Sequence, residues 1–174
     1  MDNATLLTRI TERFPDAAQQ APKDPKWVVG GDELRVTVPA ARVRDVAAFL
    51  KEQGFDLLDM VTAVDWIKEN RMELVYFFQK AETPSEKLFV KADLPRENPS
   101  VATLSDLYDA ANWQERETYD LLGIKFEGHP DLRRILLWEG YPGWPLRKDY
   151  VHTPDMYDNG SEIGLPKAAP GAPK

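Results

Sequence analysis

The chain has 174 residues, 43% of them hydrophobic, which is enough for one domain with a hydrophobic core of its own. Its formal net charge of -7 disfavours binding of nucleic acid over a broad surface, because phosphate contacts need a basic face. The sequence has no cysteine and only two histidines, so it offers no thiolate ligands for iron–sulfur clusters and too few imidazoles for an ordinary histidine metal site.

The first predicted element is a helix over residues 5–14, where Leu6, Ile10 and Phe14 share one face and Pro15 ends the helix. The acidic and basic residues of this stretch do not fit a secretory or transit peptide. No run of apolar residues reaches the roughly 18 that a membrane span needs. We therefore expect any membrane association to come through a partner.

Two short strands, 26–29 and 33–38, are predicted around a turn at 30–32. A helix follows over 41–53, with an apolar stripe on one face and Gly54 just past its end. Three longer strands are expected at 55–67, 72–79 and 87–94. The strand at 72–79 is apolar on both faces, so we place it inside the sheet.

Two more helices are predicted, one over 103–111 and one from 113 to 123. This order of elements predicts an α+β domain over residues 1–126. Its sheet is expected to be mixed and mostly antiparallel, with helices packed on one side.

The sequence changes after Phe126, where periodicity fades and proline and glycine become frequent. Residues 127–174 nevertheless contain several tryptophans and tyrosines, which disordered linkers usually lack. An extended segment cannot bury such rings against itself, and exposed apolar patches mark binding surfaces. We predict that 127–174 is an extended C-terminal segment that binds a partner.

Charged residues are concentrated in the predicted helix at 113–123, where Arg116 and Asp120 share a face and Glu117 lies beside them. One interpretation is a solvated helix face. A second is an acid–base enzyme site that combines Glu115, Glu117 and His129, although no nucleophile, metal or phosphate loop completes it. A third is a charge network paired with a partner.

Two further blocks follow. In residues 128–137, His129 fits either a loop histidine bonded to backbone or a proton site, and Arg133 and Arg134 can bind carboxylates of this chain or of a neighbour. Residues 140–150 alternate rings with charges and are stiffened by two prolines. This block fits either a loop folded back on its own domain or a docking segment anchored by Trp144 and Leu146.

We predict no catalytic, cofactor-binding or metal-binding residue in this chain. The predicted partner interface draws on all three blocks: Glu115, Arg116, Glu117, Asp120, His129, Arg133, Arg134, Trp144, Leu146, Arg147, Lys148, Asp149 and Tyr150. A nucleic-acid site at the arginines of these blocks is disfavoured by the acidic balance of the chain.

Together the three blocks resemble the 30 kDa, or C, subunit family of respiratory complex I. The resemblance is carried by the run Glu115-Arg116-Glu117-Thr118-Tyr119-Asp120-Leu121-Leu122-Gly123-Ile124, by Gly128-His129-Pro130 with Leu132-Arg133-Arg134-Ile135-Leu136, and by Pro145-Leu146-Arg147-Lys148-Asp149-Tyr150. Order and spacing agree over residues 113–150, whereas residues 1–112 agree only in their general order of helices and strands. Trp144 stands where many family members have a histidine.

The resemblance implies a cofactor-free scaffold subunit of the peripheral arm of a proton-pumping NADH:quinone oxidoreductase, on the cytoplasmic side of the cell membrane. It implies that the C-terminal segment lies on the 49 kDa-type (D) subunit, and that FMN and iron–sulfur clusters belong to partner subunits. Such a subunit would brace the cluster- and quinone-binding subunits of this translocase. The alternatives are the equivalent subunit of a membrane-bound hydrogenase or ferredoxin-driven complex, and a small stand-alone acid–base enzyme.

Overall fold

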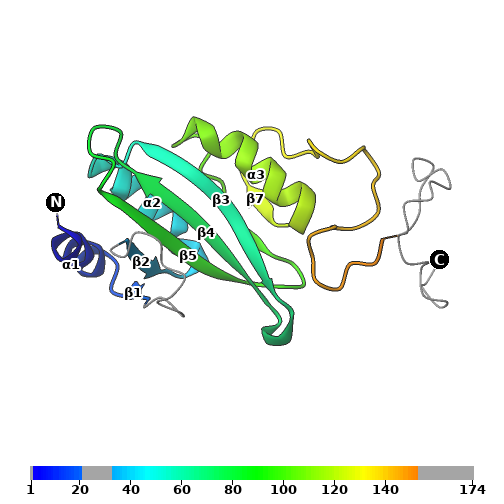
Figure 1. Cartoon of the computed structure of the whole chain (residues 1–174), viewed down its shortest axis with the longest axis horizontal. Coiled ribbons are helices and arrows are strands. Elements are labelled where there is room, and N and C mark those ends of the chain that lie inside the picture. The colour runs from blue at the N-terminus through cyan, green and yellow to red at the C-terminus, as the bar shows by residue number, and fades with distance from the viewer. Residues whose placement is uncertain (1, 21–32, 153–174) are drawn as a thin grey trace.

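A computed structural model describes residues 2–20 and 33–152 of the chain (Figure 1). In chain order the elements are α1 (Asn3–Arg13), β1 (Ala18–Gln19), β2 (Leu34–Thr37), the 3-10 helix η2 (Ala40–Arg42), α2 (Val43–Glu52), β3 (Leu57–Trp66), the 3-10 helix η3 (Ile67–Glu69), β4 (Arg71–Gln79), β5 (Lys87–Pro95), β6 (Ser100–Ala102), α3 (Asp109–Leu122) and β7 (Lys125–Glu127). None of the helices in these ranges is long and apolar enough to cross a membrane.

The main sheet has five strands in the order β1-β2-β5-β4-β3. Three of its strand pairs are antiparallel, and one, β2 with β5, is parallel. Strand β4 lies between β5 and β3, as its apolar sequence predicts. The mixed, mostly antiparallel sheet with helices on one side is therefore confirmed.

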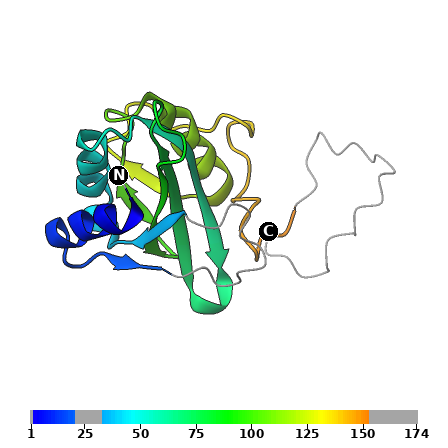
Figure 2. The same cartoon turned by 60° about the vertical axis from the view of Figure 1, so that its left-hand side comes forward.

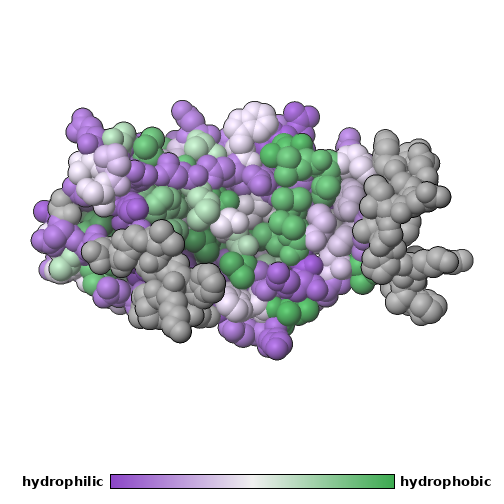
Figure 3. All heavy atoms as spheres, viewed as in Figure 1, coloured by the Kyte–Doolittle hydropathy of each residue, from purple (hydrophilic) through white to green (hydrophobic). Residues whose placement is uncertain are grey.

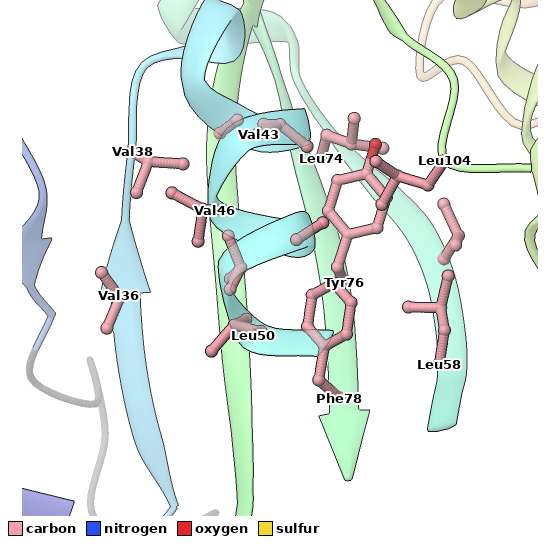
Figure 4. Close-up of a cluster of buried hydrophobic side chains, with 14 of the residues drawn as sticks. Val36, Val38, Val43, Val46, Leu50, Leu58, Leu74, Tyr76, Phe78 and Leu104 are labelled. Atoms are coloured by element: carbon pink, nitrogen blue, oxygen red, sulfur yellow. The ribbon is translucent and has the colours of Figure 1, made fainter. Parts of the chain in front are cut away.

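The hydrophobic core lies between this sheet and α2. Alternate residues of β4, among them Leu74, Tyr76 and Phe78, point toward the apolar stripe of α2 (Figure 4). That stripe includes Val46 and Leu50, which are both fully buried. Each large side chain buried in this way contributes about 1.5–3 kcal/mol to stability. In Figure 2, α1 lies beside α2 at the edge of the fold, and it packs there through an edge-to-face contact of Phe14 with Phe49.

Helix α3 covers the outer edge of β3, which is the last strand of the sheet. The side chain of Gln114 accepts a hydrogen bond from the backbone N–H of Val61, and the Thr118 hydroxyl donates to the Val61 carbonyl at 3.3 Å. These bonds satisfy backbone groups that an edge strand otherwise leaves open to other chains. A register shift between Leu58 and Met60 lies on the same strand.

The predicted helix over 103–111 is wrong. Residues 100–102 form strand β6, which pairs in parallel with β7, and residues 103–108 are turns before a single helix begins at Asp109. The cause is tertiary. The hydroxyl of Thr103 and the backbone N–H of Leu104 both donate to the buried carboxyl group of Glu115, which holds this stretch in a turn. The strand predicted at 26–29 and its turn lie outside the described residues, while the strand that follows is present as β2.

Candidate partner-binding site

The chain beyond β7 wraps around α3, and we call residues 131–150 the wrapped segment. Asp120 of α3 is its main internal attachment. The Asp120 side chain is 0% exposed, and its Oδ2 accepts backbone N–H bonds from Ile135, Leu136 and Leu137 at 2.7–3.0 Å. Burial alone would raise the pKa of Asp120, but these three donors and Arg134 outweigh it and lower the pKa. The carboxylate therefore stays ionised and bonded inside the chain.

Arg134 extends this attachment along the wrapped segment. Its Nη1 donates to Asp120 Oδ1 at 2.8 Å, and its Nη2 donates to the carbonyls of Tyr141 and Gly143 at 3.2 and 2.9 Å. The same guanidinium lies 4.5 Å from the ring centre of Trp144. One arginine thus connects the helix with two later turns of the segment.

Trp144 packs on the C-terminal end of α3. Its indole stands edge-on to Tyr119, with ring centres 5.3 Å apart, and lies against Gly123, where the backbone has φ +76°. A Cβ atom at Gly123 would come within 2.6 Å of the indole. The glycine therefore both ends the helix and leaves room for the ring.

Asp65, at the end of β3, is a second internal attachment, also 0% exposed in its side chain. Arg96 binds it in a bidentate pair at 2.7 and 2.9 Å, and the backbone N–H of Lys148 donates to Asp65 Oδ2 at 2.8 Å. Arg96 also binds the carboxylate of Asp149. The hydrogen bond from Arg96 is the main reason why the pKa of Asp65 is lowered. The far end of the wrapped segment is therefore fixed to the sheet.

Glu115 lies on the opposite, interior side of α3 and is 0% exposed. Burial raises the pKa of this carboxyl to about 7, although the bonds from Thr103 and Leu104 act in the other direction. Glu117, two residues further along, is exposed. The structure therefore places the two glutamates on different sides of the helix.

His129 is bonded to backbone at both ring nitrogens. Its Nε2 lies 3.0 Å from the carbonyl oxygen of Asn112, and its Nδ1 accepts the N–H of Asp131 at 3.0 Å. These partners assign the proton to Nε2. Because His129 is engaged here and Glu115 lies in the interior, the acid–base group proposed from the sequence is not brought together.

The outer surface of α3 and the wrapped segment has a different character. An open groove of about 700 Å³ runs along it, lined by Trp113, Arg116, Tyr119, Leu132, Arg133, Arg134, Ile135, Leu137, Glu139 and Gly140. Large hydrophobic side chains stand exposed on the same elements and just beyond them: Trp113 (63%), Leu136 (60%), Trp138 (43%), Leu146 (55%) and Val151 (59%). In Figure 3 hydrophobic residues gather in the middle and right-hand half of the view, where α3 and the segment after it lie in Figure 1. We call the groove and these five residues the docking surface.

The predicted interface residues differ in exposure. Glu115 and Asp120 have no exposed surface. Arg116, His129, Arg134, Trp144, Arg147 and Tyr150 are at most partly exposed and contact their own chain. Glu117, Arg133, Leu146, Lys148 and Asp149 are exposed, although Asp149 also binds Arg96. Contact of any of them with a partner stays a prediction. Residues 140–150 are bonded to α3 and β3 of their own chain, which agrees with the first interpretation of this block, a loop folded back on its own domain.

Sequence reasoning missed three residues of this region. Asp65 and Arg96 belong to none of the three blocks, because their partners lie far along the chain. Trp113 stood inside a block but was not assigned to the interface. Its signal was present, since a large aromatic residue on the otherwise charged face of a helix is unusual. Arg116 lies over its ring at 5.1 Å.

Within residues 2–20 and 33–152 no group of three or more histidine, cysteine, aspartate or glutamate side chains is arranged to hold a metal ion. The buried carboxylates Asp65 and Asp120 are occupied by arginines and backbone N–H groups. Their geometry supports the attachment of chain segments.

The chain is similar in sequence to subunits of known oxidoreductases. The C subunit of the NADH-quinone oxidoreductase of Moorella thermoacetica is 44% identical over 151 residues, which is 86% of this chain and 95% of that protein. The C subunit of the F(420)H(2) dehydrogenase of Methanosarcina mazei is 36% identical, over 89% of this chain and 96% of its own length.

Two solved structures share the fold. One comes from the membrane-bound sulfane sulfur reductase, an archaeal respiratory membrane complex, and matches with TM-score 0.71 and 30% identity over 90% of this chain and 87% of its own. The other is the trypsin-resistant fragment (1-134) of Nqo5, with TM-score 0.60 and 31% identity over 72% of this chain and 98% of its own. The family model for the 30 Kd subunit of respiratory-chain NADH dehydrogenase matches residues 36–155. The chain therefore belongs to the family of the 30 kDa, or C, subunit of respiratory-chain NADH dehydrogenase, which is the family that its three sequence blocks resemble.

Proposed function

We propose that this chain is a cofactor-free scaffold subunit in the peripheral arm of a proton-pumping NADH:quinone oxidoreductase. Its docking surface would lie on the 49 kDa-type (D) subunit, on the cytoplasmic side of the membrane. FMN and iron–sulfur clusters would be held by partner subunits. In this role the chain braces the cluster- and quinone-binding subunits, so that the distances between redox centres stay fixed during electron transfer.

The observation that carries this proposal is the docking surface itself. Its five large hydrophobic residues are each between 43% and 63% exposed. Trp113 lies on α3, and Leu136, Trp138 and Leu146 lie on the wrapped segment, which internal bonds hold in place, with Val151 directly after it. Monomeric proteins rarely leave such patches uncovered. Because the backbone beneath is already fixed, binding costs less ordering entropy than it would for a free tail.

The relatives support a role inside a larger complex. Two of them are subunits of oxidoreductases by name, and one solved relative comes from a respiratory membrane complex.

A second candidate function is the equivalent subunit of a related complex, such as a membrane-bound hydrogenase or a ferredoxin-driven enzyme. The similarity to a subunit of F(420)H(2) dehydrogenase and to a chain of the sulfane sulfur reductase complex supports this second candidate. In that case the scaffold role is the same, and the source of electrons differs.

The test is affinity purification of the tagged full chain from membranes in mild detergent, followed by identification of the co-purifying subunits. We expect a 49 kDa-type subunit together with flavin- and cluster-bearing subunits. A double variant Trp113→Ala/Leu136→Ala should lose about tenfold or more of the partner, because truncating a central aromatic anchor costs about 2 kcal/mol or more.

The matched control is Leu57→Ala/Val64→Ala, which removes two residues of β3 that are 40% and 38% exposed. This control should retain the partners. An equal loss in both double variants would contradict the assigned surface, and recovery of a hydrogenase subunit would select the second candidate. Recovery of no partner from wild-type membranes would overturn the scaffold role.

A further inference from the structure

Arg147 is held in a fixed position at the end of α3. Its Nε donates to the carbonyl oxygen of Leu122 at 2.8 Å, and its backbone N–H donates to the carbonyl of Trp144 at 3.1 Å. Leu122 is the last residue of α3, so the guanidinium lies at the negative end of the helix dipole. The side chain is therefore oriented before any partner binds.

The carboxylates near Arg147 are already bound by another arginine. They are Asp65 and Asp149, and Arg96 binds both. Asp65 accepts a third bond from the backbone N–H of Lys148. Arg147 therefore lies near two carboxylates that a neighbouring arginine already engages.

Arg147 makes no salt bridge of its own to any described residue. Among residues 2–20 and 33–152 no carboxylate lies within 4.0 Å of it, and neither Nη1 nor Nη2 has a hydrogen-bond acceptor. The group is nevertheless only partly exposed. Burial and the charge of Arg96 lower the pKa of Arg147, and the carboxylates of Asp65 and Asp149 only partly offset them. A half-buried guanidinium with two free nitrogens is a site for an acceptor from outside.

The shape and surroundings of the site define that acceptor. A planar fork of N–H groups fits both oxygens of a carboxylate. Leu146, the neighbouring residue, is 55% exposed, and arginines next to apolar side chains are the usual anchors of protein interfaces. The net charge of -7 repels a broadly acidic partner, so a single carboxylate in an otherwise neutral or basic surface fits best.

We infer that Arg147 is the receptor for one aspartate or glutamate side chain of the neighbouring subunit, bound through both free Nη groups. This inference rests on the proposed function, and it specifies one chemical group of the partner, an acidic side chain opposite Arg147. A phosphate of a lipid head group would satisfy the same fork, and the experiment separates the two sources.

The experiment uses the tagged full chain in membranes, with Arg147→Gln, Arg147→Lys and, as the matched charge control, Arg13→Gln at an exposed arginine of α1 outside the predicted interface. Subunits retained after detergent extraction are quantified over a series of salt concentrations. Arg147→Gln should lower retention of the partner by about tenfold or more at every salt concentration. Arg147→Lys should give an intermediate loss, because lysine keeps the charge and lacks the fork. Arg13→Gln should stay within about twofold of wild type.

Wild-type retention of the partner by Arg147→Gln would overturn the inference, as would equal losses in Arg147→Gln and Arg13→Gln. A large drop in the melting temperature of the purified Arg147→Gln chain would also overturn it, because the role would then be internal. Binding of wild type to vesicles containing anionic phospholipid that is abolished in Arg147→Gln would assign a lipid phosphate in place of the carboxylate. If the wild-type chain retains no partner at all, the proposed function fails and not this inference alone.

Discussion

Buried carboxylates in this chain serve two different purposes. Asp65 and Asp120 are paired with arginines and backbone N–H groups, which lowers the pKa of each and keeps both ionised. Glu115 has no cation within bonding distance among the described residues, and burial raises its pKa to about 7. The first two attach segments of chain, while the third packs best when it is neutral.

The stability of the chain should therefore depend on pH through Glu115. Its pKa is about 7 in the folded chain, against 4.5 for the free group. A group whose pKa is raised by folding stabilises the fold most below its unfolded value, and this contribution is lost as pH rises through the folded value. Relative to Glu115→Gln, the free energy of unfolding of wild type should fall by up to about 3 kcal/mol between pH 5 and pH 8.

Urea unfolding of both chains at the two pH values measures this difference. Glu117→Gln, on the exposed side of the same helix, is the control and should follow wild type. Parallel pH profiles for wild type and Glu115→Gln would show that the carboxyl group does not titrate in this range.

At the scale of elements, the wrapped segment is attached to α3 chiefly through Asp120. Asp120→Asn removes the charge that Arg134 and three backbone N–H groups share. Arg134 keeps the carbonyls of Tyr141 and Gly143 as acceptors but loses its charged partner, which should cost about 1.5–3 kcal/mol. We expect trypsin to cut the variant within residues 133–148 about tenfold faster than wild type or more, while the domain over 2–127 persists.

Mass spectrometry of a timed digest gives both rates. Asp109→Asn, in the exposed first turn of α3, is the control and should be cut as slowly as wild type. Equal cleavage of wild type and Asp120→Asn would mean that the carboxylate does not hold the segment.

The junction between α3 and Trp144 makes a second prediction at this scale. Gly123→Ala places a Cβ within 2.6 Å of the indole and leaves alanine at φ +76°. The backbone alone should cost about 1 kcal/mol, and displacement of the ring adds to it. In a Trp144→Ala background only the backbone cost remains. Gly123→Ala should therefore destabilise the Trp144→Ala chain less than it destabilises the wild-type chain.

A double-mutant cycle on the free energy of unfolding isolates the contact between these two residues. We expect a coupling of about 0.5–3 kcal/mol. Strict additivity would mean that the indole and the glycine do not restrict one another.

At the scale of the whole molecule, the local hydrophobic pattern predicted most of the helices and strands. Helices α1 and α2 and strands β3, β4 and β5 carry clear periodicity, and the structure has them within a few residues of the expected bounds. The spacing of Leu104, Leu107 and Ala111 imitates a helix, but Glu115 holds the first part of that stretch in a turn. Tertiary bonds overrode the local pattern there.

The attachment of the wrapped segment could not be predicted, because its partners are distant. Asp65 binds Arg96 across 31 positions and Lys148 across 83. The sequence marked Asp120 and Arg134 as important residues, yet it did not distinguish an attachment within the chain from one to a partner. That distinction depends on which way a carboxylate points, and the pattern of charges along a helix does not contain it.

The parallel pairing of β2 with β5 has a consequence for how the chain is made. Residues 34–37 pair on one side with residues 88–91, far along the chain, and on the other side with β1. During synthesis β2 cannot join the sheet until β5 has been made. We therefore expect the hairpins β3–β4 and β4–β5, which have short connections, to form first. The amino-terminal elements are then added to a sheet of β3, β4 and β5 that has already formed. Until β2 pairs with β5, the backbone N–H and C=O groups on that edge of β5 can pair with a strand of another chain, which favours aggregation.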